Sequence, residues 1–268
     1  MAMDGVTRVS LHVQSVLGRL GVLCIAPPAY AAIKILRYRF AELKETRRFC
    51  RGLFAQHRGP WLICANHLTM IDSVLLIYAM LSLWECVSLY RRVPWNLPER
   101  DNFSRNLAMR LVCYLSKCLP VRRGGERQDL QRVLDKCHTL LSAGNGIMVF
   151  PEGGRSRSGR IDTERLAYGV GRFVQRHQDM KILCLYLRGE GQDHYSALPR
   201  VGEVFHLEAA VFDPCRPAEG GLRAQREYAT QIIRQLAAME ERYFARWQRH
   251  YRPGRSIQPS ENRGPTIS

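Results

Sequence analysis

Residues 61–83 read WLICANHLTMIDSVLLIYAMLSL, which joins a short apolar run to a longer one through a polar turn. The first run, residues 61–65, has the length and composition of a buried strand, whereas residues 72–83 are long enough for a helix. His67 falls in the turn and Asp72 in the first turn of the expected helix. Sites in α/β folds usually lie at the carboxyl ends of the strands. The segment therefore predicts an imidazole and a carboxylate at that edge of a sheet.

Short apolar runs and amphipathic segments alternate through the rest of the chain. This alternation is typical of an α/β fold with a largely parallel sheet. The sequence predicts a single domain with a mostly parallel central sheet flanked by helices, preceded by a helical N-terminal segment that associates with a membrane. The expected strands are residues 61–65, 85–90, 147–150, 182–187 and 204–212, and the expected helices are residues 72–83, 103–116, 127–142, 164–177 and 222–250.

The N-terminal region carries the membrane signal. Residues 20–33 have no charged side chain and are interrupted by Pro27 and Pro28. They are shorter than the ~20 apolar residues that span a bilayer, so a helical hairpin in one leaflet and two helices packed on the core are both open. Six basic residues follow between positions 37 and 51. An apolar segment beside a basic one favours an anchor on an anionic membrane surface, although a solvated helix face has the same composition.

Three regions are expected along the chain. Residues 1–58 form the membrane-interfacial segment, residues 59–251 form the α/β domain, and residues 252–268, rich in Pro, Gly and Ser, form a disordered tail. The 268 residues are 46% hydrophobic and 24% charged, which excludes a disordered, collagen-like or multi-spanning chain. The nine cysteines form no C-x-x-C pair and lie mostly in apolar runs. They indicate a reducing compartment and no metal site.

The net charge of +16 favours binding to an acidic partner. Nucleic acid, anionic lipid and an acidic carrier protein all fit this charge. A nucleic-acid-binding protein is the alternative of another class, but no zinc-finger spacing or aromatic RNA-binding motif accompanies the basic residues. We therefore expect no nucleic acid as a partner.

A second stretch, residues 147–156, reads IMVFPEGGRS and leads from an apolar run into a glycine-rich turn. Glycines allow the backbone to approach an anion closely, and the planar guanidinium of Arg155 suits a phosphate or carboxylate. The serine of a hydrolase elbow is excluded, because Ser158 stands where the G-x-S-x-G pattern needs glycine. A nucleotide-binding P-loop is excluded, because no Gly-Lys-Ser/Thr follows the glycines.

Together these stretches resemble the glycerophospholipid acyltransferase family, whose members acylate lysophosphatidic acid and related lipids. The family's N-H-x-[ST]-x-x-D block is matched by Asn66, His67, Thr69 and Asp72. Residues 150–156 match its F-P-E-G-x-R-S block, with Gly154 where threonine is usual. Residues 120–123 look like the block that ends in arginine, here Arg123, and residues 185–189 look like the fourth block without its customary proline.

The resemblance implies direct transfer of an acyl group from a thioester, either acyl-CoA or acyl carrier protein, to a lipid hydroxyl. It implies that His67 is the general base, that Asp72 holds its imidazole, and that no cofactor takes part. It implies that Arg123, Glu152 and Arg155 bind the acceptor's polar head. It also makes the backbone N–H groups around Gly153 and Gly154 candidates for binding the oxyanion.

The identity of the acceptor is open at this point. Residues 161–169 lack the Phe-Lys-x-Gly-like segment that is typical of relatives acting on lysophosphatidic acid. Lysophosphatidic acid is the leading acceptor, and a lyso-ornithine lipid or an aryl polyene precursor is the alternative. An inactive homologue is disfavoured, because His67 and Asp72 are both present. The expected location is the cytoplasmic face of a membrane, with the protein peripheral or monotopic.

Overall fold

The computed structural model describes residues 5–103, 106–122, 124–164 and 166–248. A six-stranded sheet lies at the centre of this part of the chain, in the order β1-β6-β5-β2-β4-β3. Every neighbouring pair is parallel except β5 and β6, which are antiparallel. The predicted α/β class with a mostly parallel sheet is therefore confirmed. The strands are β1 (Arg39–Phe40), β2 (Trp61–Ala65), β3 (Trp95–Asn96), β4 (Gly146–Val149), β5 (Lys181–Gly189) and β6 (Val204–Phe212).

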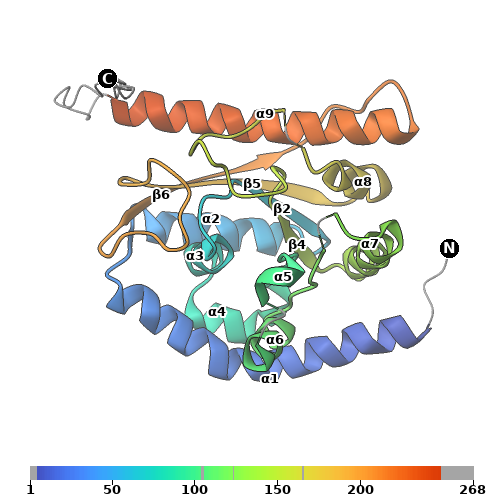
Figure 1. Cartoon of the computed structure of the whole chain (residues 1–268), viewed down its shortest axis with the longest axis horizontal. Helices are drawn as coiled ribbons and strands as arrows, with labels where there is room; N and C mark the ends of the chain where they lie inside the picture. The colour runs from blue at the N-terminus through green and yellow to red at the C-terminus, as the bar shows by residue number, and fades with distance from the viewer. Residues whose placement is uncertain (1–4, 104–105, 123, 165, 249–268) are drawn as a thin grey trace, which may run out of the picture.

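Helices cover both faces of the sheet (Figure 1). Along the upper edge of that view runs α9, and along the lower edge runs α1, outside the layer formed by α2 and α3. The helices are α1 (Gly5–Ile35), α2 (Leu43–Gln56), α3 (Asp72–Met80), α4 (Leu83–Ser88), α5 (Arg100–Phe103), α6 (Leu107–Leu115), α7 (Arg127–Ser142), α8 (Gly169–Arg176) and α9 (Gly221–Gln248), with a 3-10 turn η1 (Tyr90–Arg92).

The sheet separates two hydrophobic cores. Leu62 and Cys64 of β2 point into the core formed with α7, α8 and α9, and Trp61, Ile63 and Ala65 point into the core formed with α1, α2, α3 and α4. All five residues of β2 are buried. A strand buried on both faces reads as a continuous apolar run, which is why residues 61–65 were recognisable in the sequence.

The segment predicted as a strand at residues 85–90 is instead helical, and this prediction was wrong. Ser82 and Glu85 form a capping box at the start of α4. The Ser82 N–H donates to Glu85 Oε2 at 2.8 Å, and the Glu85 N–H donates to Ser82 Oγ at 3.3 Å. The S-x-x-E spacing is a helix-start signal that outweighs the β-branched and aromatic composition of the segment. The sheet edge is formed by β3, a few residues further along the chain.

The N-terminal apolar segment is one continuous helix, α1, with Pro27 and Pro28 inside it. It is neither a hairpin nor a pair of helices, so both expectations for residues 20–33 were wrong. Gly18 and Gly21 lie where it crosses the rest of the domain. A Cβ on Gly18 would lie 2.2 Å from the Tyr90 hydroxyl, and one on Gly21 would lie 2.9 Å from the Leu115 Cβ. The inner face of α1 therefore belongs to the packing of the domain.

The remaining predicted elements agree closely with the structure. Strands at residues 61–65 and 204–212 and the helix at residues 127–142 have the predicted bounds. The expected helix at residues 164–177 begins later, at Gly169. The predicted disordered tail, residues 252–268, lies outside the described residues.

Candidate active site

The turn after β2 is held to the neighbouring strand by a side chain. Asn66 is buried, its amide Nδ2 donates to the Leu187 carbonyl at 2.9 Å, and its Oδ1 accepts from the Leu187 N–H at 2.8 Å. The side chain of Asn66 thus continues the β2–β5 ladder one step beyond the last backbone pair, Ala65 with Leu185. This fixes where His67 leaves the carboxyl edge of the sheet.

His67 and Asp72 form the predicted pair. The His67 Nδ1 lies 3.0 Å from Asp72 Oδ2, and the Asp72 side chain is 5% exposed. The same oxygen accepts from the N–H groups of Leu68 at 2.6 Å and Thr69 at 2.8 Å, and the Thr69 hydroxyl donates to Oδ1. Asp72 is thus fixed by the first turn of α3, where a helix start favours negative charge. A carboxylate on Nδ1 leaves Nε2 as the nitrogen that can accept a proton.

The glycine-rich turn lies directly against His67. The rings of His67 and Phe150 are stacked with centroids 4.2 Å apart and an angle of 19° between their planes. The Ser156 N–H donates to the His67 carbonyl at 2.9 Å, and the His67 N–H donates to Glu152 Oε1 at 3.0 Å. This contact follows from the sheet order, because β4, which leads into the turn, pairs with β2. The two sequence blocks therefore form one site.

Glu152 lies behind His67 instead of at the surface. It is 8% exposed, and burial raises the pKa of its carboxyl to about 8, although the bond from the His67 N–H partly offsets the shift. The carboxyl therefore keeps its proton at neutral pH, and the charged form appears only as the pH rises through about 8. A neutral, buried Glu152 is suited to holding the His67 backbone. Its expected contact with the acceptor's head stays a prediction.

Arg155 is placed at the rim of the same turn. Its Nη1 donates to the Ser196 carbonyl at 3.2 Å, and its guanidinium lies 5.4 Å from the centre of the Tyr195 ring. Ser196 is also bound to the turn that follows His67, because its N–H donates to the Leu68 carbonyl at 3.0 Å. The guanidinium is half-buried, so part of its fork faces solvent beside His67's turn.

The two glycines differ in their bonding. Gly153 has a φ of 66°, a left-handed conformation that favours glycine, and its N–H donates to the Phe150 carbonyl at 2.9 Å. That N–H is used by the turn, so of the two candidate oxyanion donors Gly154 is the one that remains. Arg123 lies outside the described residues. The segment before it pairs with the chain that follows β3, through a bridge between Val121 and Glu99.

Helix α9 contacts the loop that follows the glycine-rich turn. Glu240, 4% exposed, accepts from the Arg160 Nε at 3.0 Å and from the Ile161 N–H at 3.2 Å through Oε2. Its other oxygen, Oε1, accepts from the Tyr186 hydroxyl at 3.2 Å. Sequence reasoning missed Glu240, because these partners are far from it in the chain and no local pattern links them.

A family model described as Acyltransferase matches residues 47–188, more than half of the chain. The match includes both site blocks and β2, β4 and all but the last residue of β5. The chain belongs to the acyltransferase family. No curated protein matches the chain.

The acyltransferase has an apolar cavity of about 580 Å³ beside the His67–Asp72 turn. Met70 and Ile71, which lie between the two catalytic candidates in the sequence, line it together with Val74 of α3. The opposite walls come from α1 and α6, through residues such as Val22 and Val112. Met70 and Ile71 occupy the unspecified positions of the N-H-x-[ST]-x-x-D block, and Val22, Val74 and Val112 belong to no motif. No sequence pattern therefore indicated the cavity, which forms where α1 packs on the domain.

The site contains the groups for proton transfer and no metal cluster. Within the described ranges, no group of three or more His, Cys, Asp or Glu side chains is placed to hold a metal ion. His67, oriented by the Asp72 carboxylate and with a side chain that is 16% exposed, is the candidate base of this site. An oriented, accessible imidazole beside an apolar cavity suits the deprotonation of an alcohol that carries, or reacts with, a hydrocarbon chain.

Proposed function

We propose that this acyltransferase moves a fatty acyl group from an acyl thioester to the hydroxyl of a lysophospholipid, with 1-acyl-glycerol-3-phosphate as the leading acceptor. The observation that carries the proposal is the His67–Asp72 pair, whose intervening residues Met70 and Ile71 line the apolar cavity of about 580 Å³. A cavity of this size and character suits an acyl chain. The reacting end of such a chain would then lie next to the imidazole.

The chemistry needs no covalent enzyme intermediate. Nε2 of His67 takes the proton of the acceptor hydroxyl while its oxygen attacks the thioester carbonyl. The carbonyl oxygen gains negative charge. We assign its stabilisation to the N–H of Gly154, because the Gly153 N–H already donates to the Phe150 carbonyl. The C–S bond then breaks, and the departing thiolate takes the proton from His67. Asp72, held by four donors, keeps the imidazole in one tautomer throughout.

The acceptor's head group is assigned to Arg155 because its guanidinium lies at the rim of the turn and is only partly used by Ser196. Its planar fork matches a phosphate oxygen pair.

Purified protein should form product when labelled acyl-CoA or acyl carrier protein thioester is mixed with 1-acyl-glycerol-3-phosphate. Lyso-ornithine lipid and an aryl polyene precursor belong in the same panel, and no product with any acceptor would contradict the proposal.

Arg155→Lys should raise the KM for 1-acyl-glycerol-3-phosphate by about tenfold, because one charge-assisted hydrogen bond of about 1.5 kcal/mol or more is lost. The KM for the acyl donor should change by less than about twofold, because Arg155 is proposed to bind the acceptor alone. A change below about twofold is smaller than the loss of one such hydrogen bond would cause. Initial rates measured against each substrate in turn give both values. Equal increases in the two KM values would remove Arg155 from the head-group site.

The outer face of α1 supports a location on a membrane. Leu20 is 63% exposed, Val9 62% and Leu23 54%, although all three are large and apolar. By length and composition α1 is the one helix in the described part of the chain that meets the criteria for a membrane span. Leu107 of α6 is 78% exposed, and Trp84 of α4 is 75% exposed. An apolar surface this extended marks an interaction site.

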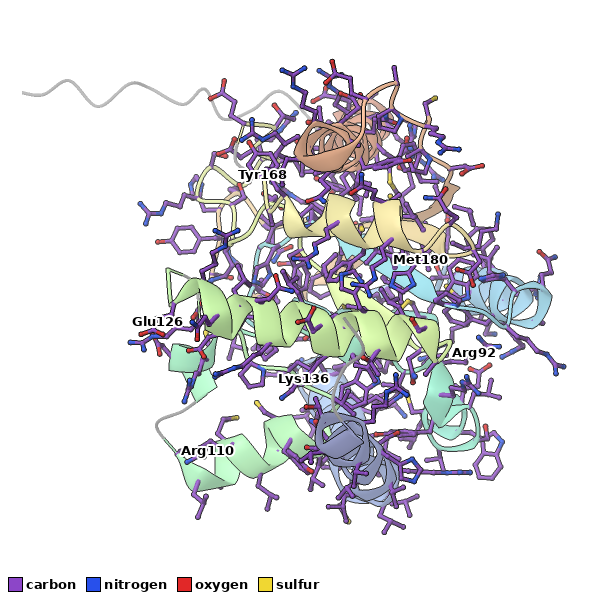
Figure 2. All side chains as sticks on the ribbon, turned by 90° about the vertical axis from the view of Figure 1, so that its right-hand side faces the viewer. Arg92, Arg110, Glu126, Lys136, Tyr168 and Met180 are labelled. Atoms are coloured by element: carbon purple, nitrogen blue, oxygen red, sulfur yellow. The ribbon has the colours of Figure 1, made fainter. Side chains whose placement is uncertain are left out.

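These helices gather on one side of the molecule. In Figure 1, α1, α4 and α6 lie at the edge opposite α9. Figure 2, turned by 90°, shows α1 nearly end-on next to α6, which is marked by Arg110. We infer that this edge rests on the cytoplasmic face of a membrane and that α1 lies in the interface, since its inner face is occupied by the domain. An acyl chain would pass from the bilayer into the cavity between α1 and α6.

Val16→Asp together with Leu20→Glu should loosen the membrane contact without disturbing the fold, because both side chains are exposed. The parent protein should sediment with anionic vesicles in high salt and be released by detergent, since apolar insertion is not screened. The double variant should be released by salt alone. This design is sharper than deletion of residues 1–36, which would also remove Gln14, Gly18 and Gly21 from the domain's packing.

Leu222→Glu on α9 provides the matched control, since Leu222 is 72% exposed and lies on the opposite edge. It should sediment like the parent protein. Complete release of the parent protein by salt would show that the outer face of α1 does not enter the lipid.

A further inference from the structure

Helix α6 ends in a turn that brings two cysteines together. Ser116 is its C-cap, Lys117 has a left-handed φ of 55°, and the Cys118 N–H donates to the Cys113 carbonyl at 3.0 Å. This is the Schellman arrangement, in which the side chains at the two ends of the closing bond commonly make an apolar contact. Here both residues are cysteines, and their side chains lie side by side, because both line the same two cavities. In this turn, the position of the usual apolar contact is therefore occupied by a pair of cysteine thiols.

Two other segments, α1 and the turn at residues 90–93, fix this turn in place. The Gln14 amide of α1 donates to the carbonyls of Tyr114 at 3.0 Å and Cys118 at 3.1 Å. The buried Lys117 Nζ donates to the carbonyls of Tyr90 and Val93, both at 2.9 Å. These bonds hold a lysine in a conformation that favours glycine. The two sulfur atoms therefore remain neighbours instead of sampling many separations.

The dithiol is also reachable. Cys113 and Cys118 line the apolar cavity, and both line a second cavity of about 480 Å³ on the other side of α6, which Arg100 and Arg110 also border. Contact with Cys118 lowers the pKa of Cys113, although burial opposes the shift, and contact with Cys113 together with burial raises the pKa of Cys118. Thiolate is the form that attacks a disulfide. Cys113 is thus the attacking group and Cys118 its resolving partner.

We propose that Cys113 and Cys118 are a reversible oxidation site that closes into an intramolecular disulfide across the end of α6, in the wall between the two cavities. The oxidant is a small-molecule disulfide such as oxidised glutathione. The Cys113 thiolate attacks one of its sulfur atoms, and the first glutathione thiolate leaves. The Cys118 thiolate then attacks the mixed disulfide at Cys113, and the second glutathione leaves. The protein loses two electrons and two protons, which reduce one glutathione disulfide to two thiols.

The chain contains a second close pair that serves as a contrast. Cys64 and Cys184 are register partners on β2 and β5, and both are fully buried. Burial raises the pKa of both thiols. Both pairs are close, but Cys113 and Cys118 line two cavities, whereas Cys64 and Cys184 are fully enclosed. Of these four thiols, Cys113 is the one whose pKa is lowered. Cys64 and Cys184 should stay reduced under conditions that close the α6 pair.

The test uses the full-length protein, incubated with oxidised glutathione, then denatured and blocked with N-ethylmaleimide before trypsin digestion. Trypsin cuts after Lys117, so residues 111–117 and 118–122 separate unless a disulfide joins them. We expect mass spectrometry to show the joined peptides in most of the protein, and dithiothreitol to separate them. Peptides carrying Cys64 and Cys184 should be blocked as thiols.

Two variants make the result specific. Cys118→Ser should leave glutathione attached to Cys113, because no partner resolves the mixed disulfide. Cys113→Ser combined with Val112→Cys moves the thiol by about 100° around α6, and it should form no joined peptide. The proposal is overturned if the exposed Cys24 and Cys215 acquire glutathione while residues 111–117 and 118–122 appear only as separate blocked or glutathione-bearing peptides.

Discussion

Replacing His67 with alanine should lower kcat by about two to four powers of ten, the usual contribution of a general base. The Nε2 nitrogen that would take the hydroxyl proton is removed. Neither Glu152, which is buried behind the turn, nor Asp72, whose oxygens still accept from three other donors, can replace it. Steady-state rates with saturating acyl donor and acceptor measure the loss.

The fold should survive this change. The His67 side chain contacts the Phe150 ring at the edge of the sheet, and the bonds that hold the turn come from its backbone and from Asn66. Circular dichroism and the melting temperature should therefore remain close to those of the parent protein. Activity of the folded variant within threefold of the parent would exclude His67 as the base.

Asp72→Asn should reduce both catalysis and stability. The carboxylate accepts from His67, from the N–H groups of Leu68 and Thr69, and from the Thr69 hydroxyl. An amide has a single oxygen, so its NH₂ group must face at least one of these donors. Each buried donor left without a partner costs about 1–3 kcal/mol. The imidazole also loses the negative charge that stabilises its protonated form, so kcat should fall by about two powers of ten or more.

Thr69→Val is the matched control, because valine has nearly the same shape as threonine. It removes one donor to Asp72 and leaves the contact between Asp72 and His67 in place. It should lower the melting temperature while kcat changes by less than about tenfold. Thermal unfolding and kcat measured on both variants separate the two effects. An Asp72→Asn protein with kcat near the parent value would show that the carboxylate holds the turn and takes no part in orienting the base.

The sequence predicted those parts of the fold whose signals are local. Residues 61–65 are apolar because both faces of β2 are buried, and residues 127–142 show the spacing of a helix with one buried face. The spacing of His67 and Asp72 likewise placed the pair correctly, since a turn between a strand and a helix brings them together. Two-residue strands such as β1 and β3 are too short to carry a pattern.

Contacts between segments that are far apart in the chain could not be predicted from the sequence. The stacking of Phe150 on His67 depends on β4 lying next to β2, and the apolar cavity depends on how α1 crosses α6. The continuous helix through Pro27 and Pro28 contradicts the local rule that prolines end helices. Both residues are exposed on the outer face, so their rings meet no neighbouring element.

Helix α9, which carries Glu240, belongs to the part of the chain that must fold together. The family's signature ends at residue 188, whereas α9 begins at Gly221. Yet Ile232, Ile233 and Leu236 of α9 are fully buried in the core above the sheet. The stretch that defines membership in the family is therefore smaller than the stretch that can fold alone. Cut at the family's boundaries, the polypeptide would lack α9 and would expose the part of the sheet that α9 covers beside α7 and α8. We expect such a polypeptide to be an aggregating fragment instead of a minimal enzyme.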